Sequence, residues 1–148
     1  MSIEVSPATA LDAAAITLRA SDLKEATEWC PGVEPYAALA ASIEHSTVAL
    51  KGLHGDAMVF IAGYTITADT VHPWLMCSDL VSVHGRVVLR HLQATTSRLV
   101  AQHPDKLIGN YVYRDNLQAR RLLSFIGFRF VPSPGNGKFD FFYYPKCV

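Results

Sequence analysis

Two amphipathic helical patterns alternate with strand-like runs through the C-terminal half of the chain, and this alternation limits the fold more than any other feature. The first pattern lies between Gly85 and His103, and its stripe consists of Leu89, Leu92, Thr96 and Leu99. The second ends at Gly127, and its stripe consists of Ala119, Leu122, Leu123 and Ile126. Strand-like runs flank the two helices at residues 74–80, 106–113 and 128–131. Because a helix between two strands is a crossover connection, strands 74–80 and 106–113 are predicted to be parallel neighbours.

Packing of both helices against a sheet has a consequence for burial. We expect five apolar side chains of the two stripes to be buried, namely Leu89, Leu92, Ala119, Leu122 and Ile126.

The N-terminal half adds helices and a hairpin to this pattern. Helices are predicted over residues 11–19, 21–29 and 35–44, and strands over 3–5, 47–51 and 57–67. A last strand is predicted over residues 139–144. The order β-α-α-α-β-β-β-α-β-α-β-β predicts one α/β (α+β) domain over residues 1–148, with a mixed central sheet and helices on both faces. Such a fold hosts many activities, so function has to come from particular residues.

Composition excludes several classes of partner. The 148 residues suit one domain, and 13 Lys and Arg balance 13 Asp and Glu. A neutral chain has no net field that attracts nucleic acid or an anionic membrane, and the longest apolar runs are shorter than the roughly 20 residues of a membrane helix. The N-terminal sequence MSIEVSPATALDAA lacks the pattern of a signal peptide. We therefore expect a cytoplasmic protein with no nucleic-acid or membrane partner.

Cysteine and histidine spacing gives no sign of a metal site. Cys30, Cys77 and Cys147 are widely separated, which favours reduced thiols. His84 and His91 lie seven residues apart without a third ligand in view. No metal is therefore expected.

Residues 116–128, with the sequence NLQARRLLSFIGF, resemble the last conserved helix of the GNAT N-acetyltransferases. The matching positions are Asn116, Ala119, Gly127 and Phe128. The resemblance implies a GNAT-like fold in which the parallel strands 74–80 and 106–113 splay apart and acetyl-CoA lies in the gap. It also implies an activity, the transfer of an acetyl group from acetyl-CoA to an amine.

The resemblance further implies which residues bind the cofactor. Pantetheine would pair with the backbone of strand 74–80, and the pyrophosphate would lie at residues 82–87, SVHGRV, where the family has Gln/Arg-x-x-Gly-x-Gly/Ala. Of that motif only the middle glycine is retained, and nearby His84 and Arg86 compensate by charge. The implied cofactor-binding residues are Met76, Cys77, Ser78, His84, Gly85, Arg86 and Asn116. Gly85 equally suits an ordinary turn into a helix.

Asp79 and Ser124 are the candidate catalytic residues. Asp79 ends the strand that would bind pantetheine, so it is a candidate general base, although Asp also commonly caps a turn before a helix. Many family members have a Tyr in the last helix that protonates the departing thiolate, and this chain has Leu123 there. Ser124 is the candidate substitute for that acid, and the alternatives are Tyr111, Tyr113 and Cys77.

A second resemblance runs over most of the chain, to a podophage family of internal virion or virion-assembly proteins with a GNAT-like fold. It rests on GVEP at 32–35, Trp74, Ser-Asp at 78–79, NYV at 110–112 and GKFDFF at 137–142. This resemblance implies a bacteriophage origin, a location in the host cytoplasm or the virion, and a phage or host protein as partner. Two functions therefore stay open: an acetyltransferase for an unidentified amine or protein acceptor, and a non-catalytic assembly or host-interaction module.

Overall fold

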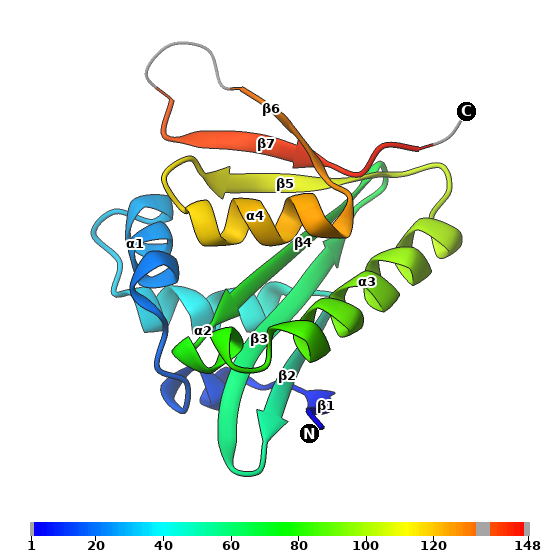
Figure 1. The fold of residues 1–148 in the computed structure, drawn as a ribbon. Coiled ribbons are helices and arrows are strands. Elements are labelled where there is room, and N and C mark those ends of the chain that lie inside the picture. The colour runs from blue at the N-terminus through cyan, green and yellow to red at the C-terminus, as the bar shows by residue number, and fades with distance from the viewer. Residues whose placement is uncertain (1, 133–136, 147–148) are drawn as a thin grey trace.

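The computed structural model describes residues 2–132 and 137–146, which fold around a seven-stranded mixed sheet (Figure 1). The strands are β1 (Glu4–Pro7), β2 (Val48–His54), β3 (Ala57–Ile66), β4 (Thr70–Cys77), β5 (Leu107–Tyr113), β6 (Arg129–Val131) and β7 (Phe139–Tyr143). The helices are α1 (Ala20–Trp29), α2 (Pro35–His45), α3 (Gly85–Gln102) and α4 (Leu117–Ile126), with short 3-10 helices η1 (Ala10–Ala14) and η2 (Asp79–Ser82).

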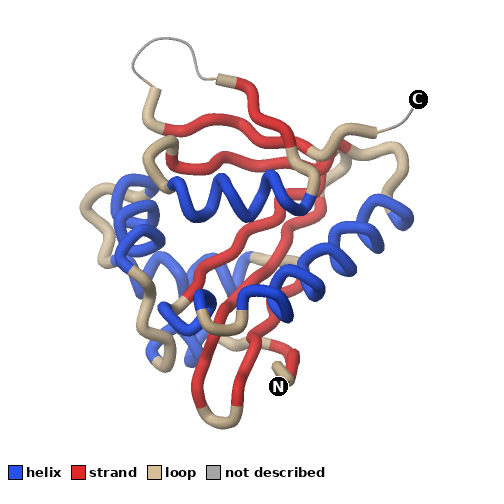
Figure 2. Tube along the Cα trace, viewed as in Figure 1, coloured by secondary structure: helices blue, strands red, loops and turns tan. Residues whose placement is uncertain are grey.

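The strand order β1-β2-β3-β4-β5-β7-β6 contains one parallel pair, β4 with β5. Every other neighbouring pair is antiparallel. Helices α3 and α4 cover the face of the sheet toward the viewer, α2 covers the opposite face, and α1 stands beside the ends of β4 and β5 (Figures 1 and 2). The predicted mixed sheet with helices on both faces is confirmed, as is the parallel pairing of the two central strands.

Local sequence signals explain several of the element boundaries. Pro35 occupies the first turn of α2, and the Glu34 carboxylate caps that turn by accepting hydrogen bonds from two backbone N–H groups. Gly55 has a φ of +60° in the β2–β3 turn, and Gly127 has a φ of +116° directly after α4. Both positions require the left-handed backbone that glycine tolerates best. The predictions at Pro35 and Gly127 are thus confirmed.

The five apolar side chains that were predicted to be buried are less buried than expected. Leu89, Leu92, Ala119, Leu122 and Ile126 are half-buried, and none of the residues of α4 is fully buried. In α3 the buried positions are Val88, Thr96 and Leu99. Four of the five predicted side chains, all but Leu89, border a cavity between the two helices and the sheet. These four side chains therefore lie beside open space instead of in a closely packed core.

Two predicted elements near the N-terminus and in the centre have different bounds. The helix expected over residues 11–19 is only the short η1, and Leu18 instead forms an isolated antiparallel bridge with Ser78. The strand expected over residues 74–80 is β4, which begins earlier, at Thr70, and ends at Cys77. It ends there because Ser78 caps η2, its hydroxyl accepting a hydrogen bond from the N–H of Leu80.

Two further features of the described residues concern the cysteines and the helix lengths. Cys30 and Cys77 are free thiols, and Cys147 lies outside the described residues. Within the described ranges no helix is both long and apolar enough to cross a membrane.

Ile108 offers a test of the core beneath the central strands. Its side chain is 0 % exposed and packs in the cluster that includes Val71 and Leu99. Ile108→Ala should lower the free energy of unfolding by about 2–5 kcal/mol, because a buried side chain is lost and a cavity remains. Leu117→Ala is the control, because Leu117 is 67 % exposed, and it should change stability by less than about 0.5 kcal/mol in urea denaturation. Equal effects of the two variants would contradict the packing described.

Candidate active site between β4 and β5

The parallel ladder between β4 and β5 stops after two residue pairs, Thr70 with Leu107 and Val71 with Ile108. In this register the next hydrogen bond would run from the N–H of residue 73 to the carbonyl of Gly109. Residue 73 is proline and has no N–H. The two strands therefore separate beyond this point and leave a V-shaped gap (Figure 1).

Two side chains enter the gap where the ladder ends and replace the missing backbone bonds. His72 donates from Nδ1 to the carbonyl oxygen of Gly109 (3.0 Å). Asn110 donates from Nδ2 to the carbonyl oxygen of Pro73 (3.1 Å), and its Oδ1 accepts from the N–H of Tyr111 (2.8 Å). These side chains satisfy backbone groups that would otherwise lack partners at the widening of the gap.

Alternation along β4 determines which backbone groups face the gap. Cys77 directs both its N–H and its C=O away from β3, since the N–H donates to Asp22 and the C=O accepts from the N–H of Arg19 (2.9 Å). Backbone direction reverses at every residue, so Leu75 also directs its N–H and C=O into the gap. Leu75 is therefore the β4 residue that offers both backbone groups to a ligand lying there.

Helix α1 closes the open end of the gap with two carboxylates. Asp22 Oδ2 accepts from the N–H of Cys77 at the end of β4 (2.7 Å). Glu25 Oε1 accepts from the N–H of Tyr113 at the end of β5 (2.7 Å). One turn of α1 thus bridges the ends of the two diverging strands.

Asn116 and Arg19 connect these carboxylates to their surroundings. The Asn116 amide donates to Asp22 Oδ1 (3.0 Å) and, at a longer 3.4 Å, to Glu25 Oε1, while its own Oδ1 caps α4 by accepting from the N–H of Ala119. Arg19 Nε lies 3.1 Å from Asp22 Oδ2 as a buried ion pair, although its N–H is not aimed well enough to form a hydrogen bond. We call Arg19, Asp22, Glu25 and Asn116 the α1 polar cluster.

Two cavities meet at the gap, one on each face of the sheet. The α3–α4 cavity has a volume of about 110 Å³ and is bordered by those helices and the two central strands. The α1–α2 cavity, on the other face, has a volume of about 510 Å³. Four residues border both cavities: Glu25, Trp74, Met76 and Tyr111. A group bound in one cavity and a group bound in the other would therefore meet at these four residues.

Glu25 has an ionisation suited to proton transfer. Burial raises the pKa of its carboxyl group from the ordinary 4.5 to about 7, against the opposing effect of the hydrogen bond from Tyr113, and the nearby charge of Asp22 raises it further. A carboxyl group with this pKa is partly ionised at neutral pH, so it can accept a proton and release it again. Sequence reasoning missed Glu25, because its place at the gap depends on how α1 meets the two strands.

The start of α3 is accessible and leaves its first backbone N–H groups outside the helical hydrogen-bond pattern. The N–H groups of the first turn, at Gly85, Arg86 and Val87, precede the first intrahelical bond, which Val88 donates to His84. A Cβ built on Gly85 would have no described atom within 4 Å, so the space over the turn is open. Arg86 is exposed there. Free N–H groups, the helix dipole and a guanidinium fit a pyrophosphate group.

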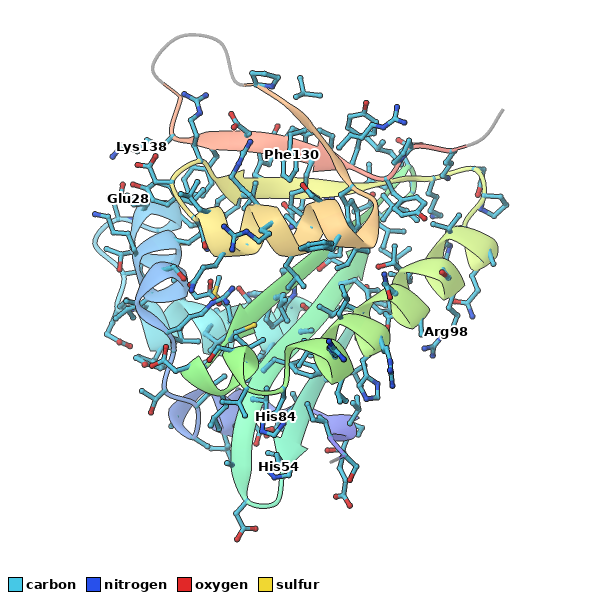
Figure 3. The ribbon with its side chains drawn as sticks, viewed as in Figure 1. Glu28, His54, His84, Arg98, Phe130 and Lys138 are labelled. Atoms are coloured by element: carbon cyan, nitrogen blue, oxygen red, sulfur yellow. The ribbon has the colours of Figure 1, made fainter. Side chains whose placement is uncertain are left out.

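His84 lies away from this open turn. It is buried, and its ring centroid is 4.5 Å from that of His54 at the end of β2, beside the start of α3 in Figure 3. The burial of this ring separates it from an anion bound above Gly85.

The other residues suggested by the sequence are divided between the gap and the surface. Met76 borders both cavities, Cys77 directs its backbone to the gap, and Ser78 is buried with its hydroxyl donating to the carbonyl of Met58 (2.8 Å). Asp79 is exposed at the start of η2, and Ser124 is exposed on α4. The structure therefore brings Met76, Cys77 and Asn116 to the gap. Gly85 and Arg86 at the start of α3, like Asp79 and Ser124, are exposed and lie outside both cavities.

Comparison with solved structures identifies the fold. The chain is similar to the PaiA N-acetyltransferase of Thermoplasma acidophilum in complex with coenzyme A, with a TM-score of 0.67, 15 % identity, and coverage of 99 % of this chain and 100 % of that one. It is also similar to the GNAT domain of S. lividans PAT, with a TM-score of 0.68, 16 % identity and coverage of 96 % and 89 %. A third similar structure is AAC(6')-Ib in complex with ribostamycin and coenzyme A, with a TM-score of 0.66, 14 % identity, and coverage of 97 % of this chain and 93 % of that one.

These likenesses establish that the chain has the GNAT fold, as its sequence predicted. No protein-family model and no curated protein sequence matches the chain.

The ionisation of Glu25 predicts a pH dependence of stability. Its pKa is raised on folding, so the folded state holds more protons between pH 4.5 and 7, and the stability contributed by Glu25 is lost as the pH rises through 7. Glu25→Gln keeps an oxygen for the Tyr113 N–H but does not titrate. As the pH rises from 4.5 to 8.5, wild type loses this stability and the variant does not. The difference in free energy of unfolding, variant minus wild type, should therefore rise by on the order of 3 kcal/mol. Urea denaturation at both pH values measures this rise, and a pH-independent difference would contradict the raised pKa.

Proposed function

We propose that this chain is a CoA-dependent N-acetyltransferase in which acetyl-CoA occupies the α3–α4 side of the gap and an amine occupies the α1–α2 side. The observation that carries the proposal is the half-buried carboxyl group of Glu25, which borders both cavities and has its pKa raised to about 7. A base at that place can reach an amine in one cavity while the acyl donor lies in the other. Asp79, which is exposed beyond β4, has no comparable access.

The residues present fit acetyl-CoA at two points. Backbone N–H groups of Gly85, Arg86 and Val87 would hold the pyrophosphate, assisted by the Arg86 guanidinium. The backbone of Leu75 would pair with pantetheine in the gap. When bound, acetyl-CoA would supply the acetyl group. The amine nitrogen would form the new C–N bond as the C–S bond breaks, and CoA would leave as the thiolate and take up a proton from solvent.

Glu25 has the role of general base in this scheme. It takes the proton that the amine nitrogen must lose, and Tyr113 and Asn116 hold its carboxyl group in place through Oε1. The family's own position holds no acid for the sulfur, because Leu123 lines the cavity where the family has Tyr, and Ser124 faces solvent. Of the alternatives, Tyr111 borders both cavities. Cys77 is no substitute, since burial raises its pKa far above neutrality and keeps it an inert thiol. We therefore expect slow turnover.

One observation favours a second function, a non-catalytic assembly or host-interaction module of phage origin. The gap-facing backbone groups of Cys77 are already bonded to Asp22 and Arg19, and Pro73 offers only a carbonyl, which accepts from Asn110. Pantetheine would thus find fewer backbone partners than an open strand provides. This arrangement is what we expect of a chain that kept the fold but lost the ability to bind the cofactor.

Binding of CoA separates the two functions. If the start of α3 holds the pyrophosphate, Arg86→Ala should weaken binding of acetyl-CoA about ten- to hundredfold, because a charge-assisted contact worth about 1.5–3 kcal/mol is lost. Isothermal titration calorimetry measures this, with Arg98→Ala, a residue of the far half of α3, as the matched control. Wild-type affinity no tighter than about millimolar, unchanged by Arg86→Ala, would favour the non-catalytic function.

The pH dependence of turnover tests the role of Glu25. With a base of pKa about 7, kcat should rise about tenfold between pH 6 and pH 8, in proportion to the ionised fraction. Glu25→Gln should lower kcat by about 10² to 10⁴ and abolish this rise. Thiol release from acetyl-CoA, measured with a saturating amine, gives both values. Retention of the rise by Glu25→Gln would assign the base to another residue.

A further inference from the structure

The α1–α2 cavity has an apolar lining with a single carboxyl group. Among the described residues that border it, Glu25 carries the only carboxyl, no Asp, Lys or Arg accompanies it, and His45 is the one basic side chain. Most of the rest are alanine, aliphatic and aromatic side chains contributed by α1, α2 and the ends of the central strands. At about 510 Å³ the cavity is within the range of small-molecule sites.

An aromatic cluster lies at the mouth of this cavity. Trp29 at the end of α1 contacts Tyr111 of β5 (ring centroids 6.3 Å apart) and Phe139 of β7 (5.1 Å), and all three border the cavity. Trp29 is 54 % exposed and Tyr111 is 51 % exposed. Large aromatic rings left accessible together beside a cavity are typical of a binding surface.

An ion pair holds this cluster together. Lys138 Nζ lies 2.7 Å from Glu28 Oε2, which joins the start of β7 to α1, as Figure 3 shows. The two rings that pack edge to face belong to the next residues in sequence, Trp29 and Phe139. The aromatic surface is therefore a fixed part of the fold at the junction of α1 and β7.

We propose that the acceptor is a cationic amine carried on an apolar body, an aromatic or alkyl ammonium, with the body on Trp29, Tyr111 and Phe139 and the nitrogen directed to Glu25. The assignment of the ligand as an acceptor rests on the proposed function. Aromatic faces attract ammonium groups, and the Glu25 carboxylate complements the same charge. A carbohydrate amine would lose water at its hydroxyl groups and gain few partners on a mainly apolar lining, and an acidic amine would be repelled by Glu25.

The proposal can be tested apart from catalysis with an ammonium that cannot be acetylated. Phenethyltrimethylammonium has no N–H, so its binding in calorimetry does not depend on acetyl-CoA or on turnover. It should bind more tightly at pH 8 than at pH 6, because Glu25 ionises between these values, and Glu25→Gln should remove the difference. Neutral 3-phenyl-1-propanol is the matched ligand control and should bind at least about tenfold more weakly.

Variants at the aromatic surface complete the binding test. Trp29→Ala should weaken binding of the probe about tenfold, and Trp29→Lys, which places a cation at the mouth, should weaken it further. Phe125→Ala is the control, since Phe125 is an equally exposed ring (66 %) on α4, outside both cavities, and it should leave binding unchanged. Probe affinity that does not exceed that of the alcohol, or equal effects of Trp29→Ala and Phe125→Ala, would overturn the proposal.

A turnover measurement distinguishes failure of this proposal from failure of the proposed function. With acetyl-CoA, phenethylamine should give a kcat/KM at least about tenfold above that of glucosamine or glutamate. Binding of the quaternary probe without turnover of any amine would overturn the acetyltransferase function and leave the ammonium site standing. Turnover that prefers glucosamine or glutamate would overturn the acceptor class and leave the acetyltransferase function standing.

Discussion

The absence of one N–H group, at Pro73, determines the shape of the centre of this molecule. The β4–β5 ladder begins with two regular pairs and would continue if residue 73 could donate to Gly109. Because it cannot, His72 and Asn110 insert their side chains, and the strands separate with their polar groups still satisfied. The gap, the two cavities that meet there and the accessible backbone of Leu75 all depend on this interruption.

The α1 polar cluster completes the gap by holding its open end at a fixed width. Asp22 accepts a hydrogen bond from the last N–H of β4, and Glu25 accepts one from the last N–H of β5. Asn116 donates to both carboxylates and also caps α4. Carboxylates withdrawn from water are costly unless they are paired. Buried Asp22 has Arg19 within 3.1 Å, whereas partial burial raises the pKa of Glu25 to about 7. One serves as structural support, and the other is free to change its protonation state near neutral pH.

Sequence patterns predicted the sheet, the two long helices and the Gly127 cap, because periodicity and glycine conformation are local properties. The resemblance of residues 116–128 to a known helix supplied the splayed strands. Glu25 escaped notice, since nothing in the spacing of α1 shows that one of its faces meets the ends of β4 and β5. The strand was predicted to begin at residue 74, after Pro73, because a proline usually ends pairing, whereas Pro73 pairs with Tyr64 of β3 and ends the pairing only toward β5. Asp79 was favoured as the base for its place after β4, and the turn of η2 carries it to the surface.

The central claim is that the Glu25 carboxyl group titrates near neutrality at the junction of the two cavities. Carbon-detected NMR of protein labelled at the side-chain carboxyl carbons of glutamate, with Glu25→Gln to assign the resonance, measures that pKa directly. The account predicts a value of about 7 for Glu25. A value near the ordinary 4.5 would contradict it, because a carboxyl group that is fully ionised at neutral pH would be neither desolvated in the gap nor matched to proton transfer there.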